Sequence, residues 1–579
     1  EELKLLPGLI KANFKSWTAG AKPFQLEGIA AQVLQRDTII HAATGAGKTG
    51  IIAGPHLLPS SKGKVTLVVS PLIALQDEQV ATFKDEFGMA AIAINSSHGG
   101  CTIDKLKKIV NGDWQIVLLS PEMLQSRRFT ENVLRKKAFG SRCLSVFIDE
   151  AHCVSHWGAS FRKKYGTVGV IRAFLPKSTP FIAVSATMTS RVRHDIALKL
   201  QFHRSDYDYI NIGNDRPAVA QIVRAIEHPL NTFADLGFVI PAKMARISEI
   251  PKTFLYTDDI QGGSLIVDHL NAQVADEFRT LGLVRPYSAA MSKKYRRDVM
   301  KLFYAGIVRV LVCTDAAGMG CNIPDIDLVV QWKLPPSLSA WVQRAGRAAR
   351  GAGRTGKAIL LVEKSAFEVD PCGAIPTPEP AVSHPTTHGR KTKQRTRRKA
   401  ATSTGKRGRE YAALHGQLRG SMDAQHDAVE VRDEPRLVDD APGEGLYAFI
   451  QTTVCRRDIL VKVFENDRSD VPKAQCCDLC NPTLFNGLRA GQPPKLARKR
   501  NAKRGEADEH VRERLFAWRR AVKKSKYPRA RWAPHAILDN DTCELLASIE
   551  ITSIEKLADL LKTSWAYWDA LGSDLFELL

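Results

Sequence analysis

The sequence predicts an α/β protein with two tandem parallel-sheet lobes, followed by a small cysteine-containing helical subdomain and a C-terminal helical region. Short β-branched apolar runs alternate with amphipathic stretches through the first two-thirds of the chain, and this rhythm stops once and then restarts. The length indicates the same, because 579 residues exceed what one hydrophobic core organises. We expect the segments 1–205, 206–368, 369–440, 441–495 and 496–579.

The apolar runs of both lobes have the length and composition of strands that are buried on two faces. In the first lobe they cover residues 38–42, 65–70, 116–120, 144–148 and 181–184. After the turn-like sequence Asn214-Asp215-Arg216-Pro217, they recur at residues 253–256, 308–313, 328–331 and 357–362. Because ligands bind at the carboxyl ends of parallel strands, we expect the loops of both lobes to face one shared cleft.

The bulk composition limits the partners and the compartment. A net charge of +22 favours a polyanionic partner, with nucleic acid as the leading candidate. No apolar run approaches the roughly 20 residues that a membrane span needs, so we expect no membrane partner. Eleven cysteines, with no apolar secretory segment before them, favour a reducing compartment. The chain opens on Glu1 rather than Met, so we expect an upstream segment.

Lys and Arg are concentrated in two tracts after Gly351. The first falls within residues 369–440, which we expect to be a disordered linker because Pro, Thr, Gly, Lys and Arg bury too little apolar surface. Its cations are Arg390, Lys391, Lys393, Arg395, Arg397, Arg398, Lys399, Lys406, Arg407 and Arg409. The tract either binds phosphates or serves as a nuclear signal, and we expect a nuclear protein. The second tract contains Arg498, Lys499, Arg500, Lys503 and Arg504.

A glycine-rich loop leaves the first predicted strand and enters a predicted helix. Its residues are Ala43-Thr44-Gly45-Ala46-Gly47-Lys48-Thr49. Glycines let backbone N–H groups close around a β-phosphate, while Lys48 reaches the β and γ oxygens and Thr49 ligates Mg²⁺. The strict pattern would have glycine in place of Ala42. The loop therefore predicts a site for ATP and Mg²⁺, against the alternative of a chance glycine turn.

Two adjacent carboxylates follow the strand predicted at residues 144–148. We expect Asp149 to hold Mg²⁺ and Glu150 to orient or deprotonate the attacking water, because phosphoryl transfer depends mainly on positioning and charge neutralisation. Adjacent acids are common on protein surfaces. Their pairing with the glycine-rich loop is what makes them specific.

The second lobe supplies an arginine-rich stretch with the sequence Gln343-Arg344-Ala345-Gly346-Arg347-Ala348-Ala349-Arg350. Arg347 and Arg350 lie three residues apart and share one face if the segment is helical. Two guanidinium groups facing the γ-phosphate would stabilise charge in the transition state and make hydrolysis depend on lobe closure. We therefore count Gln343, Arg347 and Arg350 among the expected catalytic residues, with a solvated basic helix as the alternative.

These motifs resemble those of superfamily-two helicases, and the residues between them are similar to the RecQ branch. The stretch at residues 68–80 resembles the family's strand and helix after the phosphate loop, and residues 152–165 resemble its aromatic-rich loop. The resemblance covers about residues 14–350. It implies two RecA-like lobes and an ATP-dependent DNA helicase or translocase that moves 3′ to 5′ on single-stranded and forked DNA, in DNA repair and recombination. It indicates no particular protein partner.

The resemblance also implies roles for nucleic-acid contacts. Trp157 and Phe161 would stack on bases beside Arg162, with a buried aromatic cluster as the alternative. Ser185 and Thr187 belong to a motif that resembles the one linking hydrolysis to lobe movement. Thr314 begins a stretch similar to the motif that touches both the DNA backbone and the ATP site.

Two N-terminal residues resemble the family's adenine-reading motif. Gln25 would read the adenine edge, with Lys22 beside it, and Trp17 is a candidate to stack on the base. These assignments complete the expected nucleotide site.

Four cysteines resemble the RecQ zinc subdomain, in which one cysteine on a helix joins three in a C-x-x-C-x-x-C run. They are Cys455, Cys476, Cys477 and Cys480. Ala474 stands where the run would begin, and Cys476 sits next to Cys477 instead. Either Cys476 is the fourth Zn²⁺ ligand, or the site is degenerate and ordinary packing holds the helix.

The remaining C-terminal sequence departs from the family. After Cys480 too few patterned residues remain for the winged helix that carries the strand-splitting hairpin, so the sequence supports unwinding less than translocation. The last helical stretch resembles either the small module that ends many RecQ helicases or a generic bundle. Two other functions stay open: a DNA-binding scaffold that does not unwind, and an RNA helicase.

Overall fold

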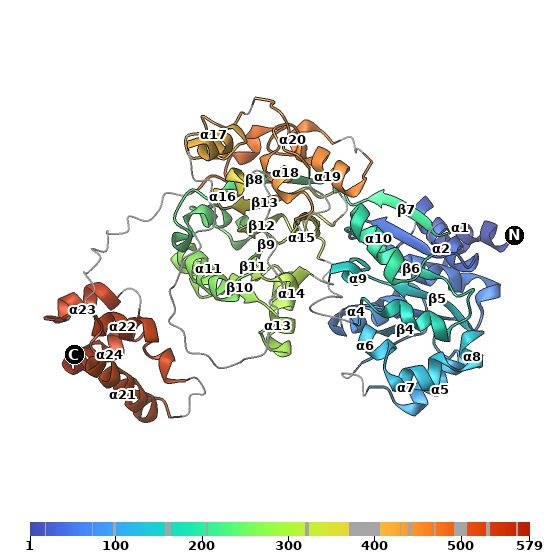
Figure 1. Ribbon diagram of the computed structural model, residues 1–579, viewed down its shortest axis with the longest axis horizontal. Helices are drawn as coiled ribbons and strands as arrows, with labels where there is room; N and C mark the ends of the chain where they lie inside the picture. The colour runs from blue at the N-terminus through green and yellow to red at the C-terminus, as the bar shows by residue number, and fades with distance from the viewer. Residues whose placement is uncertain are drawn as a thin grey trace, which may run out of the picture. The chain divides into compact units, whose positions relative to one another are not determined.

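The strands of the first lobe are apolar on both faces because helices cover both faces of their sheet. In β1 (Thr38–Ala42), Ile39 packs into one core and Ile40 into the opposite one. Seven strands pair in parallel in the order β3-β4-β2-β5-β6-β1-β7 (Figure 1). The others are β2 (Val65–Val69), β3 (Ala91–Ile94), β4 (Ile116–Leu119), β5 (Cys143–Ile148), β6 (Phe181–Ser185) and β7 (Asp208–Gly213).

Hydroxyl side chains start several of the helices that cover this sheet. Thr102, Ser120 and Thr189 each accept a hydrogen bond from a backbone N–H of the first turn that would otherwise be unpaired. The helices are α1 (Glu2–Asn13), α2 (Pro23–Val33), α3 (Lys48–Ala53), α4 (Ile73–Asp85), α5 (Ile103–Asn111), α6 (Pro121–Leu124), α7 (Arg127–Phe129), α8 (Lys137–Gly140), α9 (His152–His156) and α10 (Ser190–Lys199).

The second lobe repeats the arrangement with six parallel strands in the order β10-β11-β9-β12-β13-β8. They are β8 (Val219–Ala225), β9 (Thr253–Tyr256), β10 (Val284–Tyr287), β11 (Val310–Cys313), β12 (Leu328–Trp332) and β13 (Gly356–Val362). Its helices are α11 (Ile260–Gln273), α12 (Asp276–Arg279), α13 (Lys293–Tyr304), α14 (Asp315–Gly318), α15 (Leu338–Ala345) and α16 (Ser365–Glu368). Phe254 and Leu255 point into opposite cores, so this sheet is also covered on both faces.

These features come from a computed structural model, which describes residues 1–17, 19–71, 73–95, 100–156, 164–203, 206–318, 323–351, 353–369, 406–428, 430–437, 443–467, 471–490, 506–528, 533–562 and 565–579. The chain divides into two compact units, residues 1–492 and residues 493–579. Both lobes and the cysteine-containing subdomain belong to the first unit. None of the helices in the described ranges is long and apolar enough to cross a bilayer.

The two-lobe α/β architecture is confirmed, but the structure moves the boundary between the lobes. The predicted first lobe ended at residue 205, whereas β7 at residues 208–213 pairs with β1 in the first sheet. Most residues of β7 are only partly buried, since β7 is the edge strand of that sheet. The strand therefore lacks the continuous apolar run by which the central strands were predicted.

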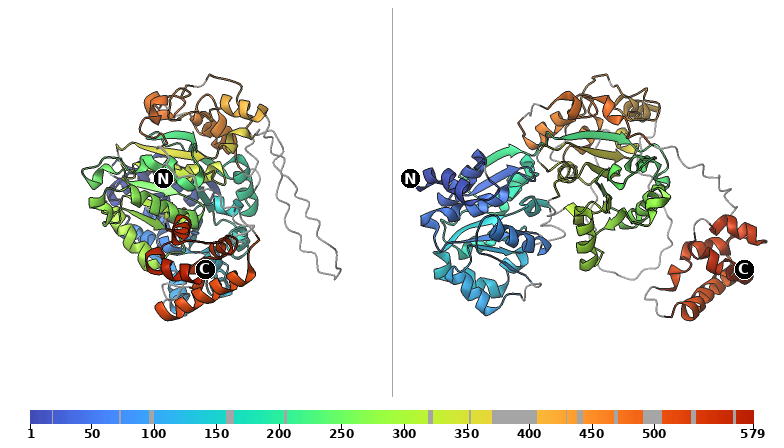
Figure 2. Two further views of the ribbon diagram at one scale, coloured as in Figure 1. Left: turned by 90° about the vertical axis from the view of Figure 1, so that its left-hand side faces the viewer. Right: turned by 180° about the vertical axis from the view of Figure 1, so that it is seen from behind.

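The cysteine-containing subdomain lies against the edge of the second sheet. It comprises α18 (Leu446–Gln451), α19 (Arg456–Phe464) and α20 (Lys473–Cys476). Cys477 forms a parallel bridge with Gln221 of the edge strand β8, and α20 packs on the same strand (Figures 1 and 2). The segment therefore completes its fold on a surface that the second lobe provides.

Part of the predicted disordered linker is ordered. Residues 370–405, including the cations from Arg390 to Lys399, lie outside the described residues. In contrast, α17 (Lys406–Leu414) and residues 415–428 and 430–437 are described. Ala412 is fully buried in the core of the second lobe, and Arg419 is 3% exposed. The segment has little apolar surface of its own, so its order comes from docking on neighbouring elements.

The C-terminal unit is a helical bundle with a core of its own. Its helices are α21 (Glu509–Lys526), α22 (Asn540–Ala547), α23 (Ile554–Leu561) and α24 (Trp568–Leu578). Leu515, Leu538 and Leu557 are among its buried residues, and Trp518 packs near Trp565 with ring centroids 6.3 Å apart. The basic cluster from Arg498 to Arg504 lies outside the described residues.

Candidate nucleotide site between the two lobes

The glycine-rich loop joins β1 to α3 in a conformation that its glycines permit. Gly45 and Gly47 have φ values of +85° and +87°, in the left-handed region that favours glycine. Lys48 donates a hydrogen bond to the carbonyl oxygen of Ala42 over 3.2 Å. Ala42 itself is the buried last residue of β1, where the backbone is extended and glycine is not required.

The side chain of Gln25 supports this loop through hydrogen bonds to its backbone. Its Oε1 accepts from the backbone N–H of Lys22 at 2.7 Å, and its Nε2 donates to the carbonyl oxygens of Ala46 and Gly47 at 3.0 and 3.3 Å. The side chain is 3% exposed, and the predicted reading of an adenine edge would require these bonds to break. Lys22 does line the cavity described below.

The predicted stacking residue Trp17 is used for packing instead. Its indole ring covers Gly50 in α3 so closely that a Cβ on that glycine would lie 2.2 Å from the ring. It also contacts Phe14 and Phe87 in edge-to-face geometry. The ring therefore fixes the helix that follows the phosphate loop.

The acidic pair follows β5 in a strained turn. Glu150 has a φ of +50°, a backbone conformation that costs about 1–3 kcal/mol for a residue with a side chain. Burial, together with Glu150, raises the pKa of Asp149 to about 6. Burial also acts to raise the pKa of Glu150, but the positive groups of His152, Lys48 and Arg347 lower it below its ordinary value. Glu150 is therefore the stronger acid of the pair.

One cavity of about 680 Å³ is lined by residues of both lobes. Lys48, Asp149 and Glu150 line it from the first lobe, and Arg347 and Arg350 line it from the second. Arg347 is 6% exposed, and among the residues that the structure describes no acceptor pairs with its Nε. A ligand with an acceptor atom in the cavity would satisfy this buried donor. Thr44, Gly45, Ala46, Gly47 and Thr49 also line it.

A polar chain connects the lobes beside this cavity. His152 Nδ1 lies 2.9 Å from Ser185 Oγ and 3.4 Å from Glu150 Oε2. Gln343 of the second lobe places its Nε2 3.3 Å from His152 Nε2 and donates to Thr187 Oγ1 over 3.0 Å. The position of the second lobe is thereby linked to the carboxylate of Glu150. This role of His152 was not predicted from the sequence.

Ser185 and Thr187 do not form an open DNA-contacting surface, in contrast to their predicted place at the nucleic-acid interface. They are 0% and 1% exposed, because their hydroxyls pair inside the protein with His152 and Gln343. Thr314 is half-buried at the end of β11. Trp157, Phe161 and Arg162 lie outside the described residues.

Two further arginines near the cavity have separate roles. Arg344 turns away from the cavity and pairs with Asp258 and Asp315 at 2.6 and 2.8 Å. Arg216, in the linker between the lobes, lines the cavity and donates to the carbonyl oxygens of Gly346 and Ala348. From the sequence, Arg216 was predicted only as part of a turn. Its position directly before Pro217, between the two lobes, was the one feature of the sequence that could have indicated its role at the cavity.

The four predicted cysteine ligands converge. Their sulfur atoms all lie within 4.8 Å of one another, and the Cys455–Cys476 and Cys477–Cys480 pairs are each separated by 3.6 Å. Tetrahedral Zn²⁺ with bonds of about 2.3 Å separates its sulfur ligands by roughly 3.8 Å. Helix α20 ends at Cys476 and Cys477 is extended with a φ of −158°, so neighbouring residues present their thiols to one point. The cysteine geometry fits a four-thiolate site.

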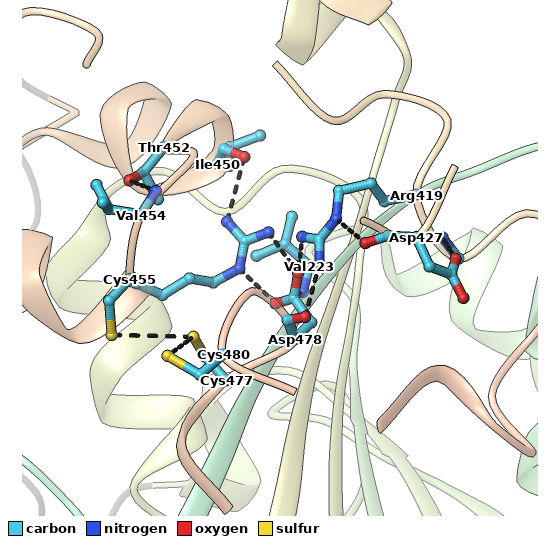
Figure 3. A network of polar contacts seen from close by, with 12 residues as sticks. Val223, Arg419, Asp427, Ile450, Thr452, Val454, Cys455, Cys477, Asp478 and Cys480 are labelled. Atoms are coloured by element: carbon cyan, nitrogen blue, oxygen red, sulfur yellow. Dashed lines mark hydrogen bonds and ion pairs between the residues drawn. The ribbon is translucent and has the colours of Figure 1, made fainter. Parts of the chain in front are cut away.

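A buried ion network lies beside these cysteines. Asp478 is fully buried and pairs with Arg419 and with Arg456, whose Nε lies 2.5 Å from its Oδ1. In Figure 3, Arg419 points toward Asp478, and Cys455, Cys477 and Cys480 lie next to this pair. Hydrogen bonds from the thiols of Cys455 and Cys476 lower the pKa of Cys477, which favours the thiolate that binds metals.

Known proteins match both lobes. Residues 22–196 match the family model of the DEAD/DEAH box helicase, and residues 248–352 match the helicase conserved C-terminal domain. The chain is 29% identical over 352 residues to the ATP-dependent DNA helicase RecQ of Pasteurella multocida, and the matched region covers 59% of this chain and 50% of that protein. Over its two lobes the chain is therefore similar to helicases of the RecQ family. Its arginine-rich stretch and acidic pair line one cavity within these matched lobes.

Other RecQ-family relatives match to a similar degree. The ATP-dependent DNA helicase Q-like 2 of Arabidopsis thaliana is 30% identical over 339 residues, covering 56% of this chain and 44% of that protein. The bifunctional 3'-5' exonuclease/ATP-dependent helicase WRN of Mus musculus is 29% identical over 325 residues, covering 55% of this chain and 21% of that protein. The chain thus spans half or less of the length of these RecQ relatives.

Proposed function

We propose that this chain is a DNA-stimulated ATPase that moves 3′ to 5′ along single-stranded DNA and separates duplexes, with forked DNA among its substrates. The observation that carries the proposal is the cavity in which Lys48 and Glu150 of one lobe face Arg347 and Arg350 of the other. DNA as the substrate is supported by the relatives, two of which are named ATP-dependent DNA helicases. The direction follows from the family resemblance.

The phosphate loop holds the ATP triphosphate. Backbone N–H groups at the start of α3 and the Lys48 ammonium neutralise the β- and γ-phosphates, once Lys48 leaves the carbonyl oxygen of Ala42. Thr49 and Asp149 line the same cavity, and their hydroxyl and carboxylate oxygens would hold Mg²⁺. When bound, Mg²⁺ neutralises phosphate charge.

Hydrolysis is carried out by groups from both lobes. Glu150 is ionised at neutral pH and accepts a hydrogen bond or a proton from the water that attacks the γ-phosphate. Arg347 and Arg350 stabilise the negative charge that spreads over the γ-phosphate oxygens. Because these arginines come from the second lobe, turnover requires that lobe to be in place.

The polar chain through His152 transmits lobe position to the water-activating carboxylate. Gln343 contacts His152 and Thr187 only while the lobes are close, and His152 contacts Glu150. Opening of the cleft after hydrolysis breaks the Gln343 bonds. The cycle of closing and opening supplies the movement along DNA, in which we assign base stacking to Trp157 and Phe161, with Arg162 beside them.

We further propose that Cys455, Cys476, Cys477 and Cys480 bind one Zn²⁺. The proposal is supported by their sulfur spacing and by their burial next to Arg456. Four thiolates would stabilise a segment that is too small for a core of its own. The structural function of such a site is to fix the start of α19, whose N-cap residue is Cys455.

The basic tract at residues 384–405 is proposed to bind DNA phosphates and to serve as a nuclear localisation signal. Its support is compositional, since seven Lys and Arg residues occur between residues 390 and 399. A fluorescent fusion that carries the tract would accumulate in the nucleus, and one in which these seven residues are replaced by Gln would not.

The function is tested by measuring ATP hydrolysis with and without single-stranded DNA. Lys48→Ala and Glu150→Gln are expected to lower kcat by at least about a hundredfold while leaving DNA affinity within about threefold. Lys84→Ala and Glu122→Gln, which change exposed residues of the first lobe, serve as matched controls and should leave turnover unchanged. Turnover retained by Lys48→Ala would refute the assignment.

The same assay separates the competing functions. A DNA-binding scaffold would bind DNA without hydrolysing ATP, and an RNA helicase would be stimulated by RNA more than by DNA. Strand displacement on forked, tailed and blunt duplexes then shows whether translocation is coupled to unwinding.

A further inference from the structure

Helix α19 of the cysteine subdomain runs beside the linker that joins the two lobes. At its C-terminal end, Asn466 Oδ1 accepts from the backbone N–H of Asn214 at 3.0 Å, and its Nδ2 donates to Asn214 Oδ1 at 2.8 Å. The carbonyl oxygen of Glu465 accepts from Asn211 Nδ2 at 2.7 Å. A Cβ on Gly213 would lie 2.7 Å from Asn466 Oδ1, so the linker packs tightly on the helix end.

The N-terminal end of α19 holds the next part of the linker. Arg457 is 5% exposed and forms an ion pair with Asp215. Its Nη2 donates to the carbonyl oxygens of Arg216 and Val219 at 3.2 and 2.8 Å. One helix of another subdomain therefore contacts the chain at both ends of the linker, from residue 211 near the end of β7 to residue 219 at the start of β8.

Arg216 carries this constraint to the arginines of the nucleotide cavity. Its guanidinium donates to the carbonyl oxygens of Gly346, Ala348 and Ala349 at 2.7, 3.1 and 3.0 Å. These carbonyls belong to the loop that carries Arg347, and Ala349 has a left-handed φ of +48°. Three charge-assisted bonds to one strained loop fix its conformation.

The helix α19 is itself fixed by the cysteine cluster. Cys455 is its N-cap residue, and Arg456 in its first turn binds Asp478. Arg457 is the next residue. A shift of this helix start would move the guanidinium of Arg457 relative to the linker.

We propose that Arg457 and Arg216 are positioning residues for ATP hydrolysis, through which the cysteine subdomain sets the placement of Arg347 and Arg350. The proposal rests on the proposed ATPase function and assigns it two residues outside the motifs. Arg457 touches the linker but does not line the cavity, and Arg216 acts through the loop backbone. A misplacement of about 1 Å at a reacting group can lower a rate by up to about a hundredfold.

The test uses Arg457→Gln and Arg216→Gln in the full chain. Each is expected to lower kcat by between about tenfold and a hundredfold, because Arg347 and Arg350 act mainly on the transition state. Binding of a fluorescent ATP analogue should change by less than about threefold. The double variant should be no slower than the slower single variant, because both residues act in one series.

One further variant separates position from charge. Arg457→Gln removes a positive charge beside Asp215, which lines the cavity, so this variant changes the local charge as well as the contacts of the linker. The pair Arg457→Gln with Asp215→Asn keeps the net charge of the wild type but still lacks the bonds to Arg216 and Val219. Its kcat is expected to stay low. A return of kcat to the wild-type value would overturn the positional role.

Arg489→Gln is the matched control, because Arg489 pairs with Asp427 in the same subdomain, away from the linker. It should leave kcat within about twofold. Amide hydrogen exchange of residues 342–351 should become faster in Arg457→Gln and stay unchanged in Arg489→Gln. Wild-type kcat and exchange in a folded Arg457→Gln protein would refute the proposal.

The outcomes also separate this proposal from the proposed function. If the wild-type protein hydrolyses ATP and Arg457→Gln behaves identically, only the positioning role fails. If the wild-type protein does not hydrolyse ATP, the proposed function fails and the exchange measurement alone decides the link between α19 and the arginine loop. Should Arg457→Gln not fold, Arg457→Lys retains the charge but cannot make all of the guanidinium contacts, and an intermediate kcat is expected.

Discussion

Two histidines of the first lobe are buried as neutral rings. Burial lowers the pKa of His41 and of His56 from 6.5 to about 4, and for His41 the charges of Lys48 and Arg193 act in the same direction. His56 Nε2 lies 3.0 Å from Thr66 Oγ1. In the unfolded chain both rings take up a proton near pH 6.5, whereas in the folded chain they do so only near pH 4.

The contribution of each histidine to the free energy of unfolding is therefore expected to be fully present above about pH 6.5 and to fall by about 3 kcal/mol as the pH drops toward 4. Asp149, whose pKa is raised to about 6, acts in the opposite direction over the same pH range. Pulse proteolysis in urea at several pH values, with His56→Gln compared with the wild type, isolates the contribution of His56. The variant should lack about 3 kcal/mol of the loss between pH 6.5 and 4, and an unchanged pH dependence would contradict the assignment to His56.

At the scale of elements, the cysteine segment shows how a shifted motif can still bring four thiols together. The expected first cysteine of the run is replaced by Ala474, and Cys476 joins the cluster instead because the chain turns from helix to extended backbone at Cys477. Whether four cysteines can converge on one point therefore depends less on their spacing in the sequence than on the direction in which each Sγ points.

Purified protein is expected to contain about one Zn²⁺ per chain, measured by elemental mass spectrometry. Cys476→Ser and Cys480→Ser should each lose most of it, because a hydroxyl does not replace a thiolate ligand. Cys101→Ser, which lies outside the cluster, is the control. Zinc content that is unaffected by Cys476→Ser would show that Cys476 is not the fourth ligand.

Removal of the metal by a chelator is expected to act on the neighbouring linker as well. Cys455 caps α19, so loss of the metal should increase amide exchange in residues 456–464 before it affects the sheets. Loss of the metal would then affect both α19 and the nucleotide cavity, as the positioning role of Arg457 requires.

At the scale of the whole molecule, the densest basic tract and the nucleotide cavity lie in different parts of the chain. The described lobes hold the nucleotide cavity, while the densest basic tract, residues 390–399, lies outside the described residues. Helix α17 begins at Lys406, so a deletion that tests the tract must end before it. Residues 384–405 meet this condition.

Deletion of residues 384–405 is expected to weaken DNA binding and to flatten its salt dependence. The segment contains seven Lys and Arg residues, and if all contact single-stranded phosphates, the slope of log K against log salt decreases by about 5. Titrations of labelled DNA at several salt concentrations measure the slope. Replacement of the segment by a Gly/Ser linker of equal length controls for linker length, and should behave as the deletion does.

Much of the candidate site could be predicted because its chemistry is local. A phosphate loop, an acidic pair at a strand end and paired arginines are short patterns whose residue types the chemistry dictates. The places of Arg216, Arg457 and His152 could not be predicted, because each acts through a partner more than 30 residues away in the sequence. The edge strand β7 was missed for a related reason, since partial burial removes the apolar run.

The candidate phosphate, magnesium and zinc ligands and the two α/β lobes could be predicted, because strand periodicity and motif chemistry are encoded over a few neighbouring residues. The folded structure was needed to show that Lys48, Glu150 and Arg350 share one cavity, that Ser185 and Thr187 are buried, and that residues 406–428 and 430–437 are ordered. These outcomes depend on which distant surfaces pack together, and long-range packing is a property of the complete fold.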